Sequence, residues 1–241
     1  MSLASAKLVA LDAKGLRISG PPLLAGCPDF GRLAGLYRWM EWASFGPWLQ
    51  RCRCTWLENL AGSRRALVFG DGDGRFAARL LCANRHVTLD AVDASPAMLA
   101  ALWRRAGQNR TRVQPHVADA RIWQPRGPGY DLVVSHFFLD CLTTDEVGSL
   151  AKTVRAATEK EALWLVSEFA VPESRLGRWF APPLIAALYA AFGLLTGLRV
   201  RRLPDYAAAL RQAGFELTLR RCWLGGLLTS ELWSGVRSAT L

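Results

Sequence analysis

The segment from Gly70 to Gly74, in which glycine alternates with aspartate, has the clearest potential for chemistry. It follows the short apolar run 66–69 and precedes a helical pattern that begins near Phe76. A turn without Cβ atoms lets a ligand approach the backbone closely, and the N-terminus of the next helix favours a negative group. Gly70, Gly72 and Gly74 therefore predict a ligand-binding loop, although the same spacing also fits a dinucleotide-binding fingerprint.

Asp93 is the second residue of interest, because it lies at the end of the second expected strand, 87–92, and nineteen residues after Gly74. At that place in an α/β unit a carboxylate accepts hydrogen bonds from both hydroxyls of a ribose, with Ala94 beside it. An alternative is structural, since Asp93 together with Ser95 would also cap a helix that opens at the following proline. The agreement of strand end, spacing and glycine loop favours ribose binding.

Candidate acid–base residues follow a third apolar run, 130–135, in the sequence Ser135-His136-Phe137-Phe138-Leu139-Asp140. A histidine titrates near neutral pH, so His136 is a candidate general base, and Asp140 would orient it or a substrate. The alternative is that His136 is a hydrogen-bonded residue at the rim and Asp140 caps the next helix. No set of His, Cys, Asp and Glu residues has the spacing of a metal site.

These motifs together resemble those of the class I, Rossmann-like methyltransferases that use S-adenosylmethionine, over about residue 30 to the C-terminus. The resemblance implies that Asp119 contacts the adenine amino group and that Ala120 supplies a backbone N–H. It also implies that Ser135 lies beside the transferable methyl group and that the helix N-terminus after the glycine loop faces the methionine carboxylate. The glycine at position 214, before the terminal strand pair, is typical of the family.

The family pattern is broken at Val68, two residues before Gly70, where most members have Asp or Glu that holds the methionine amino group. Either Asp71 or Asp73 takes over this role from the loop, or backbone carbonyls hold the amino group. Asp71 is the candidate.

A narrower resemblance points to the ubiquinone and menaquinone C-methyltransferases. It rests on residues 30–37 and on Glu168-Phe169-Ala170-Val171-Pro172. It implies that an N-terminal helix closes over the cofactor, with Tyr37 near it.

The elements that must position these residues alternate between strands and helices. Strands are expected near 66–69, 87–92, 112–117, 130–135 and 162–169, with helices between them, followed by a helix at 204–213 and two closing strands at 215–222 and 227–233. Strands separated by helices of this length predict a parallel sheet covered on both faces. We therefore expect a three-layer α/β fold with a mostly parallel seven-stranded sheet, a closing antiparallel strand and an N-terminal helical cap.

The chain is expected to have an N-terminal extension over residues 1–29 and one catalytic domain over 30–241. Residues 30–62 form the cap as two helices, the second from Trp48 to about Leu60. An apolar insertion at 178–203 borders the acceptor site. The uncharged run 179–198 would just reach across a bilayer, but its prolines and glycines favour a buried or substrate-facing helix. Its flanking arginines allow peripheral contact with an anionic membrane.

Composition limits the partners. The 241 residues include 30 Lys and Arg against 20 Asp and Glu, a formal net charge of +10. The basic residues are dispersed, so no specific nucleic-acid partner is expected. Six cysteines without a metal pattern favour buried, reduced thiols, and no secretory signal is evident, so a cytoplasmic location is expected.

The expected function is transfer of a methyl group from S-adenosyl-L-methionine to a small, hydrophobic or aromatic, lipid-like acceptor. One rival is a protein of the same fold that binds the cofactor without catalysis, which Val68 favours. The other is an NAD(P)-dependent oxidoreductase, which shares the glycine loop and Asp93 but does not account for Asp119 with the closing strand pair.

Overall fold

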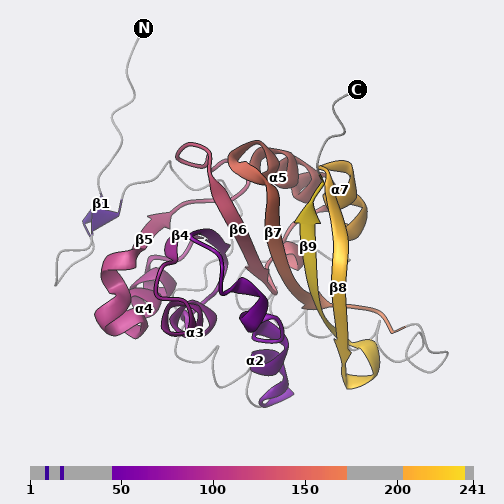
Figure 1. Cartoon of the computed structure of the whole chain (residues 1–241), viewed down its shortest axis with the longest axis horizontal. Helices are drawn as coiled ribbons and strands as arrows, with labels where there is room; N and C mark the ends of the chain where they lie inside the picture. The colour runs from indigo at the N-terminus through magenta and orange to yellow at the C-terminus, as the bar shows by residue number, and fades with distance from the viewer. Residues whose placement is uncertain (1–8, 11–16, 19–44, 173–202, 237–241) are drawn as a thin grey trace, which may run out of the picture.

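A computed structural model describes residues 9–10, 17–18, 45–172 and 203–236 of the chain (Figure 1). Tyr37, the first helix expected in the cap, and nearly all of the expected insertion at 178–203 lie outside the described residues. The role of Tyr37 and the placement of the insertion therefore stay predictions. None of the described helices is long and apolar enough to cross a membrane.

Seven strands of the described chain form one sheet with the order β5-β4-β3-β6-β7-β9-β8. Their bounds are β3 (Arg65–Phe69), β4 (Thr88–Asp93), β5 (Val113–Val117), β6 (Tyr130–His136), β7 (Thr158–Phe169), β8 (Phe215–Trp223) and β9 (Leu228–Gly235). The strands β3 to β7 pair in parallel, and β9 is antiparallel to both of its neighbours. A separate antiparallel pair joins β1 (Val9–Ala10) and β2 (Arg17–Ile18). The expected mostly parallel sheet with an antiparallel closing strand is confirmed.

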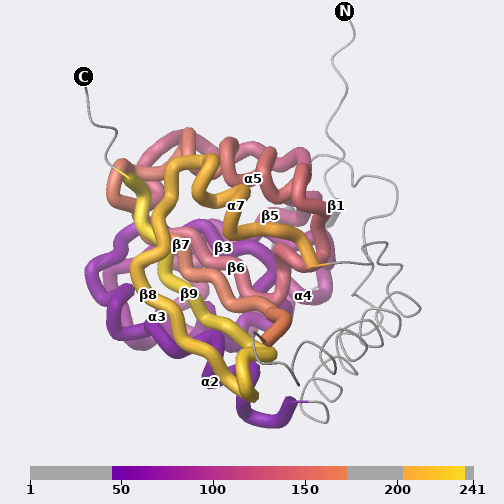
Figure 2. Tube along the Cα trace, turned by 90° about the vertical axis from the view of Figure 1, so that its right-hand side faces the viewer, coloured from indigo at the N-terminus to yellow at the C-terminus, as the bar shows by residue number. Residues whose placement is uncertain are grey.

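Helices cover both faces of this sheet (Figures 1 and 2). They are α2 (Trp48–Arg53), α3 (Arg75–Ala83), α4 (Pro96–Ala106), α5 (Thr144–Ala157) and α7 (Tyr206–Gln212), with short 3-10 turns η2 (Leu57–Leu60), η3 (Gly107–Arg112), η4 (Leu139–Cys141) and η5 (Leu224–Gly226). Alternate strand residues point to opposite faces. Leu67 and Phe69 of β3 pack with α5 and α7, whereas Ala66 and Val68 pack with α3 and α4. The result is the expected three-layer arrangement.

The expected helix from Trp48 to Leu60 is wrong in its second half, because α2 ends at Arg53. The Thr55 hydroxyl donates to the carbonyl oxygens of Arg51 and Cys52. The indole N–H of Trp56 donates to the carbonyl of Ser230 in β9 at 3.2 Å. These contacts turn the chain onto the sheet, where it continues as the 3-10 turn η2.

Candidate functional site

The candidate site lies where the carboxyl ends of β3, β4, β6 and β7 meet at one edge of the sheet. The strand order runs from β3 through β4 to β5 in one direction and from β6 through β7 in the other. In open α/β sheets ligands bind outside the strand ends at such a reversal. Gly70, Asp93, His136 and Glu168 all lie at these ends.

The three loop glycines have left-handed backbones, with φ of 61° at Gly70, 59° at Gly72 and 80° at Gly74. Their surroundings differ. A Cβ at Gly70 would lie 2.6 Å from the Phe138 ring, and one at Gly74 would lie 2.5 Å from the Leu102 backbone, so both positions require glycine for packing. A Cβ at Gly72 would meet no atom within 4 Å. Only Gly72 therefore has the open space over its backbone that a ligand requires.

Asp71 is buried at the start of α3. One carboxylate oxygen, Oδ2, accepts a hydrogen bond from the Ala77 N–H at 2.9 Å. The Ala77 N–H is therefore occupied by the chain's own carboxylate, and the role of this helix N-terminus toward the methionine carboxylate stays a prediction. The other oxygen, Oδ1, is buried and has no hydrogen-bond partner among the described residues. Burial raises the pKa of Asp71 to about 6.

Asp73, the alternative to Asp71, has its charge paired. Its Oδ1 lies 2.9 Å from Nε of Arg75, and its Oδ2 lies 2.7 Å from a terminal nitrogen of Arg105. These contacts tie the loop to α3 and α4. Of the two loop aspartates, Asp71 is thus the one with an oxygen left to bind a ligand.

Asp93 ends β4 beside the glycine loop, since the Gly70 N–H donates to the Val92 carbonyl at 3.2 Å. Its Oδ1 accepts from the Ser95 N–H at 2.8 Å. The cap of α4 is Ser95, whose hydroxyl oxygen accepts from the Met98 N–H. Burial, and secondarily the nearby charge of Asp71, raise the pKa of Asp93 to about 7. Asp93 therefore holds the turn between β4 and α4 but does not cap α4. Ala94, the next residue, is half-buried.

Asp119 follows β5 and lies close to Asp93, because the Ala118 N–H donates to the Asp93 carbonyl at 3.0 Å. Both of its carboxylate oxygens accept from the Arg121 guanidinium, a pairing that the sequence did not predict. Ala120 is buried against the α5 face of the sheet. Ser135 is buried within β6, where its hydroxyl oxygen accepts from the Trp164 indole N–H at 3.0 Å.

His136 ends β6 and is buried, with a relative exposure of 2%. Neither ring nitrogen has a hydrogen-bond partner among the described residues, so the alternative of a hydrogen-bonded rim residue is wrong. The imidazole packs edge-on against Phe76 at 4.5 Å between ring centroids. Burial, and then the charge of Arg53, lower its pKa well below the usual range, and the ring is neutral at physiological pH.

Asp140 lies in the turn η4 and does not cap α5. The cap is Thr143, which forms a capping box with Glu146. Asp140 is instead buried near Glu168, and burial together with the Asp140 charge raises the pKa of Glu168 well above its usual range. The carboxyl groups of Asp140 and Glu168 therefore lie together in this part of the site. Of the two, only Asp140 was predicted as a site residue.

Sequence reasoning missed the role of Glu168 at the end of β7. Its Oε1 accepts from the backbone N–H groups of Phe138 and Leu139 at 3.0 and 2.7 Å. Between β6 and these residues Phe137 takes a left-handed backbone with φ of 52°. Glu168 thus holds a strained loop beside the candidate base. The only signal for Glu168 in the sequence was its position at a strand end. Its role could not be predicted, because its partners are backbone N–H groups about thirty residues earlier in the chain.

No group of His, Cys, Asp and Glu within the described ranges is arranged to hold a metal ion. The five described cysteines are free, and of these Cys52 is buried while Cys82 and Cys222 are exposed. The expectation of buried thiols is therefore wrong for Cys82 and Cys222.

Residues 66–161 match the protein family described as "Methyltransferase domain". No curated protein sequence matches the chain. Similar solved structures include the mitomycin 7-O-methyltransferase MmcR, with a TM-score of 0.63, 14% identity and coverage of 86% of this chain and 61% of that one. The S-adenosylmethionine-dependent methyltransferase SibL has a TM-score of 0.61 and 23% identity, covering 88% and 63%. An O-methyltransferase family protein from Burkholderia thailandensis has a TM-score of 0.64 and 17% identity, covering 86% and 60%.

The chain thus spans about three fifths of the length of these structures, which share its fold. The sheet order, the glycine loop at the strand reversal and the family match agree with one another. Residues 66–161 thus match a methyltransferase domain, and the chain shares its Rossmann-like fold with the similar methyltransferase structures.

Proposed function

We propose that this protein methylates a small, apolar or aromatic acceptor with S-adenosylmethionine as the donor. The observation that carries the proposal is the combination of open space over Gly72 with the unpartnered Oδ1 of Asp71. Loop glycines alone also suit a dinucleotide, but a buried acid oxygen beside the loop suits a positively charged amino group.

The described residues offer partners for the methionine, ribose and adenine parts of the cofactor. Asp71 would accept from the methionine amino group and so replace the acid that the family has at position 68. Val68 itself lies in the apolar layer against α3 and α4, where a carboxylate would be costly to bury. Asp93, with one oxygen committed to Ser95, would accept from the ribose hydroxyls through the other. Asp119 and Ala120 remain the proposed adenine contacts, with Arg121 fixing the Asp119 carboxylate.

When bound, the cofactor supplies an activated methyl group on a sulfonium. The protein must align the acceptor with it and exclude water. His136 is neutral and therefore able to take a proton from an acceptor hydroxyl, although its lowered pKa makes it a weaker base. Asp140 beside Glu168 would orient the acceptor. We propose Ser135 only as a backbone neighbour of the methyl group, because its hydroxyl is engaged by Trp164.

Similarity to a mitomycin 7-O-methyltransferase supports a small-molecule acceptor, and two of the similar proteins described above are named O-methyltransferases. We therefore propose an acceptor with an aromatic hydroxyl group. The narrower likeness to ubiquinone and menaquinone C-methyltransferases is not supported by these similar proteins. Membrane contact by residues 178–203 also stays a proposal.

Calorimetric titration of the full chain tests the proposal. S-adenosylmethionine and S-adenosylhomocysteine should bind with saturation and raise the midpoint of thermal unfolding, since both bind only the native state. NAD and NADP should not. Nicotinamide binding without sulfonium binding would overturn the assignment. Cofactor binding without turnover of any hydroxylated aromatic acceptor would instead favour the non-catalytic binding protein.

A further inference from the structure

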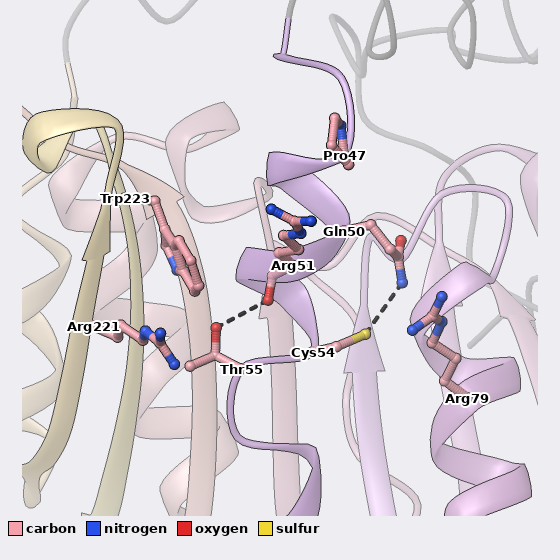
Figure 3. Close-up of a pocket in the computed structure, with 8 residues that line it drawn as sticks. All are labelled: Pro47, Gln50, Arg51, Cys54, Thr55, Arg79, Arg221 and Trp223. Atoms are coloured by element: carbon pink, nitrogen blue, oxygen red, sulfur yellow. Dashed lines mark hydrogen bonds between the residues drawn. The ribbon is translucent and has the colours of Figure 1, made fainter.

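A cleft of about 520 Å³ lies on the flank of the molecule between α2, α3 and the end of β8 (Figure 3). It shares no residue with the glycine loop or with the carboxyl ends of β4 and β6. Its lining consists of Pro47, Gln50, Arg51, Cys54, Thr55, Arg79, Arg221 and Trp223. The volume is within the usual range for small-molecule sites.

The lining is strongly positive. It contains three arginines, Arg51, Arg79 and Arg221, and no aspartate or glutamate. None of the three has an ion pair with a carboxylate among the described residues. Like charges gathered in a cleft repel one another and focus a positive potential, and the net charge of +10 adds to it. An anion would relieve this repulsion.

Aromatic rings hold two of these side chains in place. The Arg221 guanidinium lies 4.3 Å from the Trp223 ring centroid, and that of Arg51 lies 4.9 Å from the Trp48 ring centroid. The two tryptophans pack together at 5.7 Å. A guanidinium stacked on a ring keeps its N–H groups free at its edge and loses less conformational entropy when it binds. Arg51 and Arg221 are thus partly ordered before any ligand arrives.

We infer that this cleft binds a phosphate group. Figure 3 shows Arg221 from β8 and Arg79 from α3 pointing toward α2, which carries Arg51. Guanidinium groups arriving from three elements suit a tetrahedral dianion with several oxygens better than a planar carboxylate with two. The phosphate belongs either to a soluble phosphorylated molecule or to a phospholipid headgroup.

The test begins with inorganic phosphate titrated into the full chain in a phosphate-free buffer. Saturable binding is expected for the wild type, and at least a tenfold loss of affinity for a variant with Arg51→Gln, Arg79→Gln and Arg221→Gln. Arg85→Gln is the control, because Arg85 is exposed in the turn that follows α3 and does not line the cleft. Circular dichroism and S-adenosylhomocysteine affinity check that the fold is retained.

Binding that is absent, unsaturable, or reduced equally by Arg85→Gln would overturn the inference. Sedimentation with phosphatidylglycerol vesicles then separates the two sources. If the triple variant loses vesicle binding and the wild type is released by inorganic phosphate, the ligand is a lipid headgroup. If wild type and triple variant sediment alike, the cleft serves a soluble phosphate.

Discussion

At the scale of single residues, two glycines of the loop are required for different reasons: Gly74 for packing and Gly72 for the approach of a ligand. Gly74→Ala would place a Cβ 2.5 Å from the backbone of Leu102, whereas Gly72→Ala would meet nothing. Both changes add the strain of a left-handed backbone, about 1 to 2 kcal/mol. We expect Gly72→Ala to fold with this modest loss and to lose most of its S-adenosylmethionine affinity. Gly74→Ala should lose clearly more stability. Urea unfolding and calorimetry measure the two effects, and unchanged affinity in Gly72→Ala would place the ligand elsewhere.

The two loop aspartates form a second matched pair. Asp71→Asn keeps an oxygen for the Ala77 N–H but removes the charge that faces the open site. We expect about a tenfold loss of cofactor affinity, the scale of one hydrogen bond to a charged group. Asp73→Asn only weakens ion pairs with Arg75 and Arg105, so its affinity should change little. An equal effect of both changes in calorimetry would mean that the loop charge acts at long range and that Asp71 has no special contact.

At the scale of the elements, the turn after β6 depends on one side chain from β7. Glu168 accepts from two buried backbone N–H groups, and burial together with the Asp140 charge raises the pKa of its carboxyl well above the usual range. Glu168→Gln supplies an equivalent oxygen and should keep nearly all of the stability. Glu168→Leu leaves both N–H groups without an acceptor and should lose about 2 to 4 kcal/mol. Urea unfolding compares them. A Gln variant as unstable as the Leu variant would show that Glu168 is charged in the native state.

The strands and helices were largely predictable because each has a local signal. Apolar runs ended at glycine or aspartate, and Gly214 marked the end of α7 with a φ of 88°. The end of α2 was not predictable, since it depends on a bond from Trp56 to β9. In the site, Asp93 was placed at its strand end by spacing alone. The partners of Asp119, His136 and Glu168 depend on which neighbours the tertiary structure brings to the strand ends, and no local pattern carries that information.

At the scale of the whole molecule, the carboxyl groups of the site make the stability of the fold depend on pH. Burial raises the pKa of Asp71 to about 6 and that of Asp93 to about 7, from a usual value of 3.8. The native state therefore binds protons more readily than the unfolded chain over this range. The contribution of these groups to stability is complete below their unfolded pKa and is lost as pH rises through their native pKa. His136, with its lowered pKa, acts in the opposite direction below its usual value of 6.5.

Above about pH 6.5 the His136 effect fades and the carboxyl groups dominate the pH dependence. We therefore expect the free energy of unfolding to fall by about 1 kcal/mol from Asp93 alone between about pH 6.5 and pH 8. Asp93→Asn has no titrating group at this position, so its stability should depend less on pH over that interval. Urea titrations of both proteins at matched ionic strength measure the difference. A wild type whose stability rises with pH, or a variant with the same slope, would show that Asp93 ionises normally and that the site is better solvated than its burial implies.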